Sequence, residues 1–349
     1  MNIPAAFVDR LRCPCCRGSF HRNLPTLVAQ ALGPADAGLK PRATLGSETL
    51  TCSGCAASYP VVNGSPILID PRRSVFTPDD IVADYERTLA VPQRSWVRRL
   101  TWWIASRTPH VTSHRRQEVI ARRFADRLAA ETPAPAILIV GSGTDGIGMA
   151  AFRAIPGATL CEFDVYLTQT RMLVADLLDL PFEAGSFDAV VAQGVLEHVI
   201  DPHRAAEEIH RVLKPGGLLL STTPFVLGVH LPVADYTRFS RLGLIRLFRR
   251  FTPLDCDVIE GAGVSLAYSL SYFGMALASS FGHPAGAKIA KYAVNYLIFF
   301  LPWVDRFVRR SPISIDAASS YFYIGRRSET MLADREIVAM FKGVGLCPW

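Results

Sequence analysis

Apolar residues in the middle of the chain occur in short runs that alternate with helical patterns. Five runs, rich in Val, Ile, Leu and Phe, are found at 136–140, 158–164, 172–176, 186–193 and 218–224. Continuous apolar runs of this length are typical of strands that are buried on both faces of a parallel sheet. A helix is predicted at 203–213 and a last strand at 319–326. The alternation predicts an α/β fold with a doubly wound, mostly parallel, Rossmann-like sheet.

A different pattern occupies the N-terminal part of the chain. The segment 57–70 predicts a strand, an Asn-Gly turn and a second strand. Two Cys-x-x-Cys pairs precede it, formed by Cys13, Cys16, Cys52 and Cys55. Zinc binds four such thiolates in a tetrahedron, and four cysteines leave no coordination position for a substrate, so a structural zinc ion is predicted. The alternatives are a redox Cys-x-x-Cys pair or chance clustering, and Cys15 is interpreted as a bystander.

The strand at 136–140 runs directly into a glycine-rich turn. This turn begins with Gly141, Ser142 and Gly143, and glycines at the carboxyl end of a parallel strand let a ligand approach the backbone closely. The next strand ends at Asp164, where a carboxylate can accept hydrogen bonds from both ribose hydroxyls of a nucleoside. Glu162 shares the same face of that strand, and Asp164 is chosen because it lies at the strand end.

The spacing of the glycines also allows a dinucleotide-binding site. Gly141, Gly143 and Gly146 satisfy Gly-x-Gly-x-x-Gly, which makes a dehydrogenase the competing interpretation. However, nothing after Asp164 offers a Tyr-x-x-x-Lys pair or a similar acid for hydride chemistry. A nucleoside cofactor of another kind is therefore favoured.

Several further motifs follow in a fixed order: Asp176-Leu-Leu-Asp-Leu-Pro-Phe, Phe187-Asp188, Leu196-Glu-His198 and Leu213-Lys-Pro-Gly-Gly. Together they resemble the class I S-adenosylmethionine methyltransferases, particularly the group that includes ubiquinone-biosynthesis enzymes, over about residues 136–226. The resemblance implies an enzyme whose cofactor is S-adenosylmethionine. Where relatives carry an acidic residue two positions before the first glycine, this chain has Ile139.

The same resemblance implies a role for each residue of the cofactor site. Gly141, Ser142 and Gly143 would pass under the methionine part, and Asp164 would hold the ribose. Asp176 would hold the adenine amino group with Leu177 beside it, and Gln193 would line the pocket near the sulfonium.

Residues 10–70 resemble a second family, the small zinc-ribbon proteins that bind and activate RNA and protein methyltransferases. The resemblance rests on the Cys-Pro-x-Cys knuckle, the second Cys-x-x-Cys pair, Tyr59-Pro60 and the following Gly-x-Pro turn. The predicted domains are a zinc ribbon at 1–72, a helical linker at 73–130 and a methyltransferase domain at 131–335. The last contains a hydrophobic helical insertion at about 255–312.

Two histidines are candidates for catalysis. Methyl transfer to a hydroxyl needs a base with a pKa near neutrality, and histidine is the usual choice. His198 follows the fourth strand, although a helix-capping role is the alternative, and His230 lies in the loop after the fifth strand. Some ubiquinone-pathway relatives bind a divalent metal through a Glu three residues before the Glu-His pair. That position is Gly194 here, so no catalytic metal is expected.

Composition adds information on partners. Half of the residues are hydrophobic and the mean hydropathy is +0.22, which excludes intrinsic disorder and directs attention to membranes. Residues 261–287 and 292–304 carry no charged side chain, but one is rich in Gly and Ser and the other is too short to span a bilayer. Both are predicted to be helices that cover the substrate cleft or offer an apolar rim to lipid. Trp96, Leu100 and Trp103 share one face of a further predicted helix.

The predicted acceptor is a small molecule or a lipid- or glycan-linked compound. Peripheral contact with a membrane fits the apolar segments, and the N-terminus shows no export signal, which predicts a cytoplasmic protein. A net charge of +6 favours an anionic partner without requiring nucleic acid. Methylation of RNA and a non-catalytic, cofactor-binding scaffold remain the alternative functions. The oligomeric state is left open.

Overall fold

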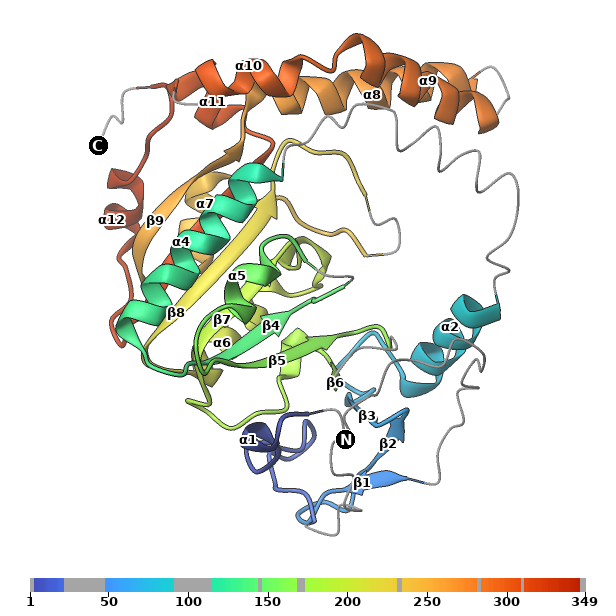
Figure 1. Cartoon of the computed structure of the whole chain (residues 1–349), viewed down its shortest axis with the longest axis vertical. Helices are drawn as coiled ribbons and strands as arrows, with labels where there is room; N and C mark the ends of the chain where they lie inside the picture. The colour runs from blue at the N-terminus through green and yellow to red at the C-terminus, as the bar shows by residue number, and fades with distance from the viewer. Residues whose placement is uncertain are drawn as a thin grey trace. The chain divides into compact units, whose positions relative to one another are not determined.

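The fold is known from a computed structural model (Figure 1). The structure describes residues 3–21, 48–90, 114–143, 146–167, 173–230, 234–280, 284–308 and 311–345. The first compact unit comprises Met1–Val91, Phe124–Gln193 and Asp201–Leu219. The second comprises Pro92–Arg123, Gly194–Ile200 and Leu220–Trp349. Trp96, Leu100 and Trp103, predicted to share a helical face, lie outside the described residues.

The first unit is built on a sheet with strand order β1-β2-β3-β6-β5-β4-β7-β8. The strands are β1 (Thr49–Thr51), β2 (Ser58–Val62), β3 (Ser65–Leu68), β4 (Ala136–Val140), β5 (Thr159–Asp164), β6 (Leu173–Ala175), β7 (Phe187–Gln193) and the first half of β8 (Leu213–Pro224). Strands β3, β6, β5, β4 and β7 pair in parallel. The α/β fold with a mostly parallel sheet is therefore confirmed.

The first unit has five helices or parts of helices among its described residues, and α6 confirms the helix that was predicted at 203–213. They are α1 (Ala5–Val8), α2 (Pro78–Ala90), the C-terminal part of α4 (Arg115–Glu131), α5 (Met149–Arg153) and α6 (Pro202–Val212), with the short 3-10 turn η1 (Leu177–Asp179). Helix α6 begins where Asp201 accepts a hydrogen bond from the Arg204 amide and Pro202 occupies the first turn. Both are preferred features of a helix N-terminus.

The cysteine-bearing segment extends the sheet. Its hairpin turns at Asn63 and Gly64, whose φ angles of +50° and +76° suit a two-residue turn. Strand β3 then pairs in parallel with β6, with Ile67 opposite Val174. The hairpin thereby continues the central sheet through main-chain hydrogen bonds.

The second unit contains the end of β8 and two long antiparallel strands, β9 (Phe251–Glu260) and β10 (Ser320–Arg327). Its helical elements are η2 (Leu196–His198), the N-terminal part of α4, α7 (Arg241–Leu247), α8 (Ala262–Ser280), α9 (Pro284–Leu297), α10 (Leu301–Val308), α11 (Pro312–Asp316) and α12 (Asp334–Ala339). Among the described residues, no helix is long and apolar enough to cross a membrane.

The predicted start of the helical insertion, at about residue 255, was wrong. Residues 255–260 belong to β9, where Cys256 faces Tyr323 of β10. Burial alternates along this strand, with Cys256 and Val258 buried and Asp255 and Asp257 more open. This period of two is typical of a strand covered on one face. The helices begin only at Ala262.

Candidate active site and zinc centre

The glycine turn lies at the carboxyl end of β4, inside the first unit. Gly141 and Gly143 adopt φ angles of +64° and +41°, which favour glycine. The amides of Gly141 and Ser142 both donate to the Phe163 carbonyl, at 3.1 and 3.3 Å. These bonds hold the turn against the end of β5.

Asp164 lies directly against this turn. One carboxylate oxygen accepts from the Gly143 amide at 2.9 Å, and the other accepts from the Val165 amide at 2.7 Å. Glu162, the other candidate, is 3.3 Å from Arg153 instead. Asp164 is thus the acid that the fold brings to the glycine turn.

Asp176 is buried and has two protein partners. Its Oδ1 caps η1 by accepting from the Leu178 amide at 2.9 Å, and its Oδ2 accepts from the Ser74 hydroxyl at 2.5 Å. Ser74 comes from the segment that follows the β2–β3 hairpin. The segment after the β2–β3 hairpin therefore contributes directly to the surroundings of this acid.

Gln193 ends β7, which is the neighbour of β4 in the sheet. Its side-chain amide nitrogen is buried and finds no acceptor among the residues that the structure describes. A buried donor without a partner is costly, so a ligand that supplied an acceptor would relieve it. Three features of this site fit a nucleoside cofactor. They are the unpaired Gln193 amide, the glycine turn with its positive φ angles, and the lone pairs of Asp164 that remain free.

A cluster of ionisable side chains forms within the second unit. Glu197 and His198 lie in η2, and His230 follows β8 in the sequence. The Nε2 atoms of His198 and His230 are 3.9 and 4.0 Å from Glu197 Oε1. The cluster brings together both predicted catalytic histidines and an acid that was not predicted.

Burial and charge tune this cluster. Glu197 is 1% exposed, and burial raises its pKa to about 7. Burial and the neighbouring His198 lower the pKa of His230. Asp235 accepts a hydrogen bond from the His230 amide at 3.0 Å and is paired with Arg238, whose hydrogen bonds hold the pKa of Asp235 well below its usual range.

The four predicted zinc ligands converge in the first unit. Their sulfur atoms all lie within 4.8 Å of one another, with Cys13 to Cys55 at 3.7 Å and Cys16 to Cys52 at 3.4 Å. Four sulfurs that each lie about 2.3 Å from a central zinc ion are about 3.8 Å apart, so the cluster has the size that zinc requires. Cys15 lies apart from it, and its sulfur accepts from Arg72 at 2.7 Å.

The two knuckles have the same backbone geometry. The amide of Cys13 donates to the Gly18 carbonyl at 2.8 Å, and the amide of Cys52 donates to the Ala57 carbonyl at 2.9 Å. A Cβ atom at Gly18 would lie 3.2 Å from the sulfurs of both Cys16 and Cys52. Glycine is therefore needed where the backbone passes closely over the cluster.

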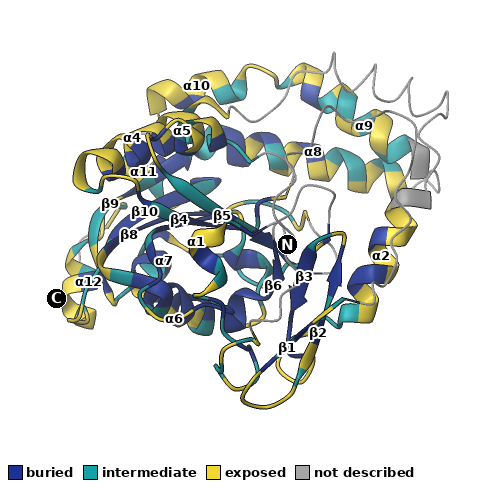
Figure 2. Ribbon diagram, turned by 60° about the horizontal axis from the view of Figure 1, so that its bottom comes forward, coloured by how far each residue is buried: buried dark blue, intermediate teal, exposed yellow. Residues whose placement is uncertain are grey.

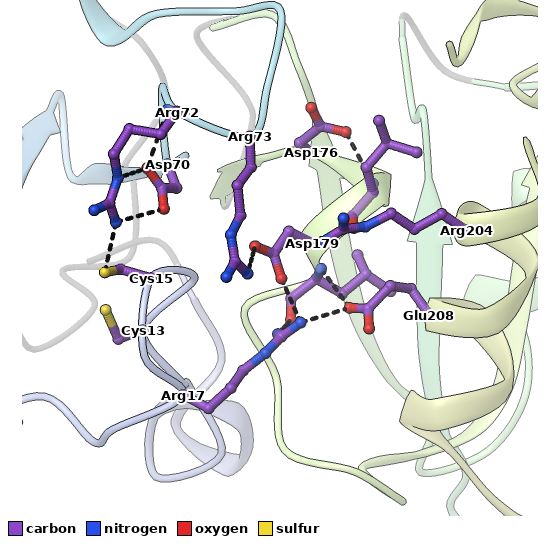
Figure 3. Close-up of polar contacts among 12 residues, drawn as sticks. Cys13, Cys15, Arg17, Asp70, Arg72, Arg73, Asp176, Asp179, Arg204 and Glu208 are labelled. Carbon is purple, nitrogen blue, oxygen red and sulfur yellow. Dashed lines mark hydrogen bonds and ion pairs between the residues drawn. The ribbon is translucent and has the colours of Figure 1, made fainter. Parts of the chain in front are cut away.

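An ionic network joins the first knuckle to η1 and α6 (Figure 3). Arg17 donates to the carboxylate of Asp179, to Glu208 at 3.2 Å and to the Leu180 carbonyl at 2.5 Å. Arg73 reaches the other oxygen of Asp179 at 3.3 Å. Both acids are buried, and their charge is compensated by Arg17 of the knuckle together with Arg73, which follows β3, and Arg211 of α6.

Comparisons with known proteins agree with this architecture. Residues 152–221 match the model of a family described as a methyltransferase domain. A probable S-adenosylmethionine-dependent methyltransferase of Mycolicibacterium smegmatis is 28% identical over 201 residues, which is 55% of this chain and 74% of that protein. The ubiquinone/menaquinone biosynthesis C-methyltransferase of Geotalea daltonii is 31% identical over 162 residues, 40% of this chain and 69% of that protein.

The chain belongs to the S-adenosylmethionine-dependent methyltransferases. A solved structure, a putative sarcosine dimethylglycine methyltransferase from Galdieria sulphuraria, superposes with a TM-score of 0.38 at 19% identity and covers 59% of this chain and 86% of that one. Membership of this family makes the protein an enzyme, as the order of its motifs predicted.

Sequence reasoning on this methyltransferase missed three groups near the candidate sites. Ser74 had no signal, because its contact with Asp176 joins residues 102 positions apart. Arg17 lies beside a ligand of the first knuckle but reaches acids far along the chain. Glu197 carried a signal, since it belongs to the Leu-Glu-His motif, but its carboxylate was not assigned a role.

Proposed function

We propose that this methyltransferase binds S-adenosylmethionine at the carboxyl ends of β4, β5, β6 and β7. The residues proposed to hold it are Gly141, Ser142, Gly143, Asp164, Asp176, Leu177 and Gln193. The observation that carries the proposal is the position of Asp164 against the Gly143 amide. Ligands of open α/β sheets bind at this edge, which supports the assignment. When bound, the cofactor supplies an electrophilic methyl group.

His198 and His230 are proposed as the residues that act on the acceptor. The Nδ1 atom of His198 contacts the Ala234 carbonyl, and Nδ1 of His230 lies 3.4 Å from Asp235. When these contacts hold the Nδ1 protons, the Nε2 lone pair of each ring is available to accept the proton of an acceptor hydroxyl. Since methyl transfer is an in-line displacement, the remaining task of the protein is to align the acceptor and to exclude water.

The surface of the second unit favours a lipid-linked acceptor. Much of α8, α9 and α10 is exposed (Figure 2), and these helices and the turn between α9 and α10 carry a series of exposed large apolar side chains. On the helices these include Phe273, Leu277, Ile289, Tyr296, Leu297, Trp303 and Phe307, and in the turn they are Phe299 and Phe300. Monomeric soluble proteins rarely expose so many large apolar groups together, and such surfaces usually mark contact with protein or membrane.

Charge on these helices indicates an anionic membrane surface. Within residues 262–308 the cations are Lys288, Lys291 and Arg306, and the one acid, Asp305, is buried. The Arg306 guanidinium lies 3.5 Å from the centre of the Trp303 ring. Aromatic side chains beside cations are typical of helices that lie in the interface of anionic lipids. A cavity of about 900 Å³ with both basic and acidic walls opens beside α10 and suits a polar headgroup.

The zinc ion is proposed to be structural. It would fix the two knuckles. Through the contact of Arg17 with Asp179 and the pairing of β3 with β6, it would also stabilise the end of β6, which Asp176 follows. Bound zinc supplies folding energy to small domains with thin cores. Its four cysteine ligands leave no position for substrate.

An unbiased labelling experiment tests the proposed acceptor class. The protein is incubated with S-adenosylmethionine labelled in the methyl group and a cell extract, which is then separated into lipid, RNA, protein and small-molecule fractions. Label in the lipid or small-molecule fraction is expected. Label in RNA would contradict the proposal, and cofactor binding without any transfer would instead indicate a non-catalytic scaffold.

Vesicle binding tests the lipid surface separately. The Phe273→Ser/Phe307→Ser variant is expected to lose at least tenfold in affinity for anionic vesicles, because each inserted aromatic ring contributes about 1.5–3 kcal/mol. Val75→Ser is the matched control, since Val75 is also exposed but lies in the first unit. Equal binding of vesicles by the wild type and both variants would refute the proposal that this surface contacts lipid.

A further inference from the structure

Hydrogen bonds hold the backbone of the segment that leads into His230. The carbonyls of Leu227 and Gly228 accept from the Arg238 guanidinium at 3.2 and 3.3 Å. The His230 amide donates to Asp235 at 3.0 Å, and Arg238 is paired with the same carboxylate. Asp235 and Arg238 belong to the same connection between β8 and α7. At these positions the connection is therefore held by its own residues.

Val229 differs, because its carbonyl is bonded by another element. It accepts a hydrogen bond of 2.8 Å from the hydroxyl of Tyr272, which lies in the middle of α8. The Tyr272 ring rests on the backbone of Gly228, where a Cβ atom would lie 2.7–3.0 Å from three ring carbons. Real Cβ atoms do not approach other atoms so closely. Glycine at position 228 is therefore what lets the tyrosine reach the Val229 carbonyl.

Helix α8 presents a different face to its surroundings. Four exposed apolar side chains recur along it at intervals of four, three and four residues: Leu266, Leu270, Phe273 and Leu277. This spacing places them on one face of the helix. Tyr272 projects away from that face, since each residue advances an α-helix by about 100°. Helix α8 thus carries exposed apolar side chains on one side and bonds the loop after β8 from another.

Further hydrogen bonds tie α8 to the neighbouring helices. Asp305 of α10 accepts from the amides of Gly261, Gly263 and Val264 at the start of α8. In the middle of α8, the buried Ser271 hydroxyl donates to Asn295 of α9 at 2.6 Å. The position of the residue that follows, Tyr272, is therefore set by the helical layer that carries the exposed apolar side chains.

The bond to Val229 lies one residue before a candidate catalytic group. The His230 ring packs edge to face on His198, with ring centroids 4.8 Å apart, and its Nε2 atom is 4.0 Å from Glu197 Oε1. A base must lie within hydrogen-bond reach of the proton that it accepts, and a misplacement of about 1 Å can cost about 100-fold in rate. A contact that fixes the backbone beside His230 therefore bears directly on its function.

We infer that Tyr272 is a positioning residue for His230 and that it couples the exposed face of α8 to this histidine. The inference rests on the proposed function, in which His230 acts on the acceptor and α8 contacts an anionic lipid surface. Lipid can shift the loop only if it binds two arrangements of the helical layer with different affinity. Tyr272 is the contact through which such a difference reaches the histidine.

Nuclear magnetic resonance of the full-length protein with ¹³C-labelled histidine rings tests the positioning role. The signal of His230 is assigned by its loss in His230→Gln. Tyr272→Phe keeps the ring but removes the hydroxyl, and it should shift this signal. Burial lowers the pKa of His230, so a loosened loop should raise that pKa towards its usual value of about 6.5.

Two further variants make the comparison specific. Gly228→Ala should change the His230 signal in the same way, because the added Cβ displaces the Tyr272 ring. Gly228 does not have a positive φ angle, so alanine introduces no backbone strain there. Tyr296→Phe is the matched control, since Tyr296 lies on α9 and is 68% exposed, and it should leave the signal unchanged.

Bicelles that contain phosphatidylglycerol test the coupling to lipid. In the wild type they should shift the signal of His230 and leave that of His203, which is exposed on α6, unchanged. Tyr272→Phe should still bind the bicelles, because the exposed face of α8 is intact, but the shift of its His230 signal should be smaller.

The outcomes separate this inference from the proposed function. The same His230 signal in wild type, Tyr272→Phe and Tyr296→Phe would overturn the positioning role, and bicelle binding that leaves the wild-type signal unchanged would overturn the coupling. A protein that binds no bicelles would refute the proposed lipid surface and the coupling with it, while the variants in solution still decide the positioning role. Calorimetry with S-adenosylmethionine on the same samples shows that each variant is folded, and failure of the wild type to bind would refute the proposed methyl transfer instead.

Discussion

Arg17 offers the sharpest test of how the first cysteine knuckle is held against η1 and α6. Its guanidinium contacts Asp179, Glu208 and the Leu180 carbonyl. Arg17→Met keeps the aliphatic stem and the Cβ atom, so the cost of the φ angle of +63° is unchanged. The substitution therefore removes the charge and its hydrogen bonds while it preserves most of the packing.

The expected loss follows from the burial of the two acids. Removing one partner of a buried ion pair costs about 3–5 kcal/mol. The Arg17 side chain is 36% exposed, and Arg73 and Arg211 still contact the acids in the variant. Because solvent and these arginines screen the unpaired charge, we expect the free energy of unfolding to fall by about 2 kcal/mol. This corresponds to a urea midpoint lower by roughly 1 M. Arg73→Met is the control, because Arg73 makes one ion pair at 3.3 Å and is 48% exposed, and it should cost less than about 1 kcal/mol.

The effect should also depend on pH. Burial opposes ionisation of Glu208, but hydrogen bonds from Arg211 and the charge of Arg17 hold its pKa below the usual value. Stabilisation from a carboxyl group of lowered pKa is present above its unfolded pKa of about 4.3 and is lost as the pH falls through the folded value. Burial raises the pKa of Asp179, so this acid is protonated earlier during acidification. The difference in stability between wild type and Arg17→Met should be largest at neutral pH and narrow as the pH falls below about 4.3. Equal midpoints for the two arginine variants, or a gap independent of pH, would refute the reasoning.

Three further substitutions test other parts of the structure. Cys52→Ser should abolish zinc binding by the ribbon and make it sensitive to proteolysis, whereas Cys15→Ser should retain zinc in a metal analysis, because Cys15 lies outside the cluster. Ser74→Ala removes a donor to the buried Asp176 and should cost about 1 kcal/mol in urea unfolding; an unchanged midpoint would show that this contact contributes nothing. Asp305→Ala removes a buried carboxylate that accepts hydrogen bonds from three backbone amides at the start of α8. The free energy of unfolding, measured by thermal unfolding, should fall by about 2–3 kcal/mol, and a fall below about 0.5 kcal/mol would contradict a capping role.

Local chemistry explains why much of the fold could be predicted. The run of β4 is apolar throughout, and such a run is stable only when both faces of the strand are buried. Asn63 and Gly64 are residue types that readily adopt the positive φ angles of a tight turn, as they do in the structure. Asp201 followed by Pro202 marks the start of α6. These features depend on neighbouring residues alone, so one sequence contains the information.

Features that depend on distant residues were not predictable. Nothing local to Ile67 shows that β3 pairs with β6, and β9 was placed in a helical insertion because its partner strand β10 begins some sixty residues later. The approach of His230 to Glu197 likewise depends on a loop that returns to η2. Apart from the start of the helical insertion, the predicted domain boundaries stay predictions, as do the roles of the cofactor residues.

Calorimetry with S-adenosylmethionine on the full-length protein tests the central claim most directly. Wild-type protein should bind one cofactor per chain, and Asp164→Asn should weaken binding about tenfold or more, the rough worth of a charge-assisted hydrogen bond. Glu162→Gln should bind like the wild type, because Glu162 pairs with Arg153. Absence of binding at millimolar cofactor, or equal affinity of Asp164→Asn and wild type, would contradict the account.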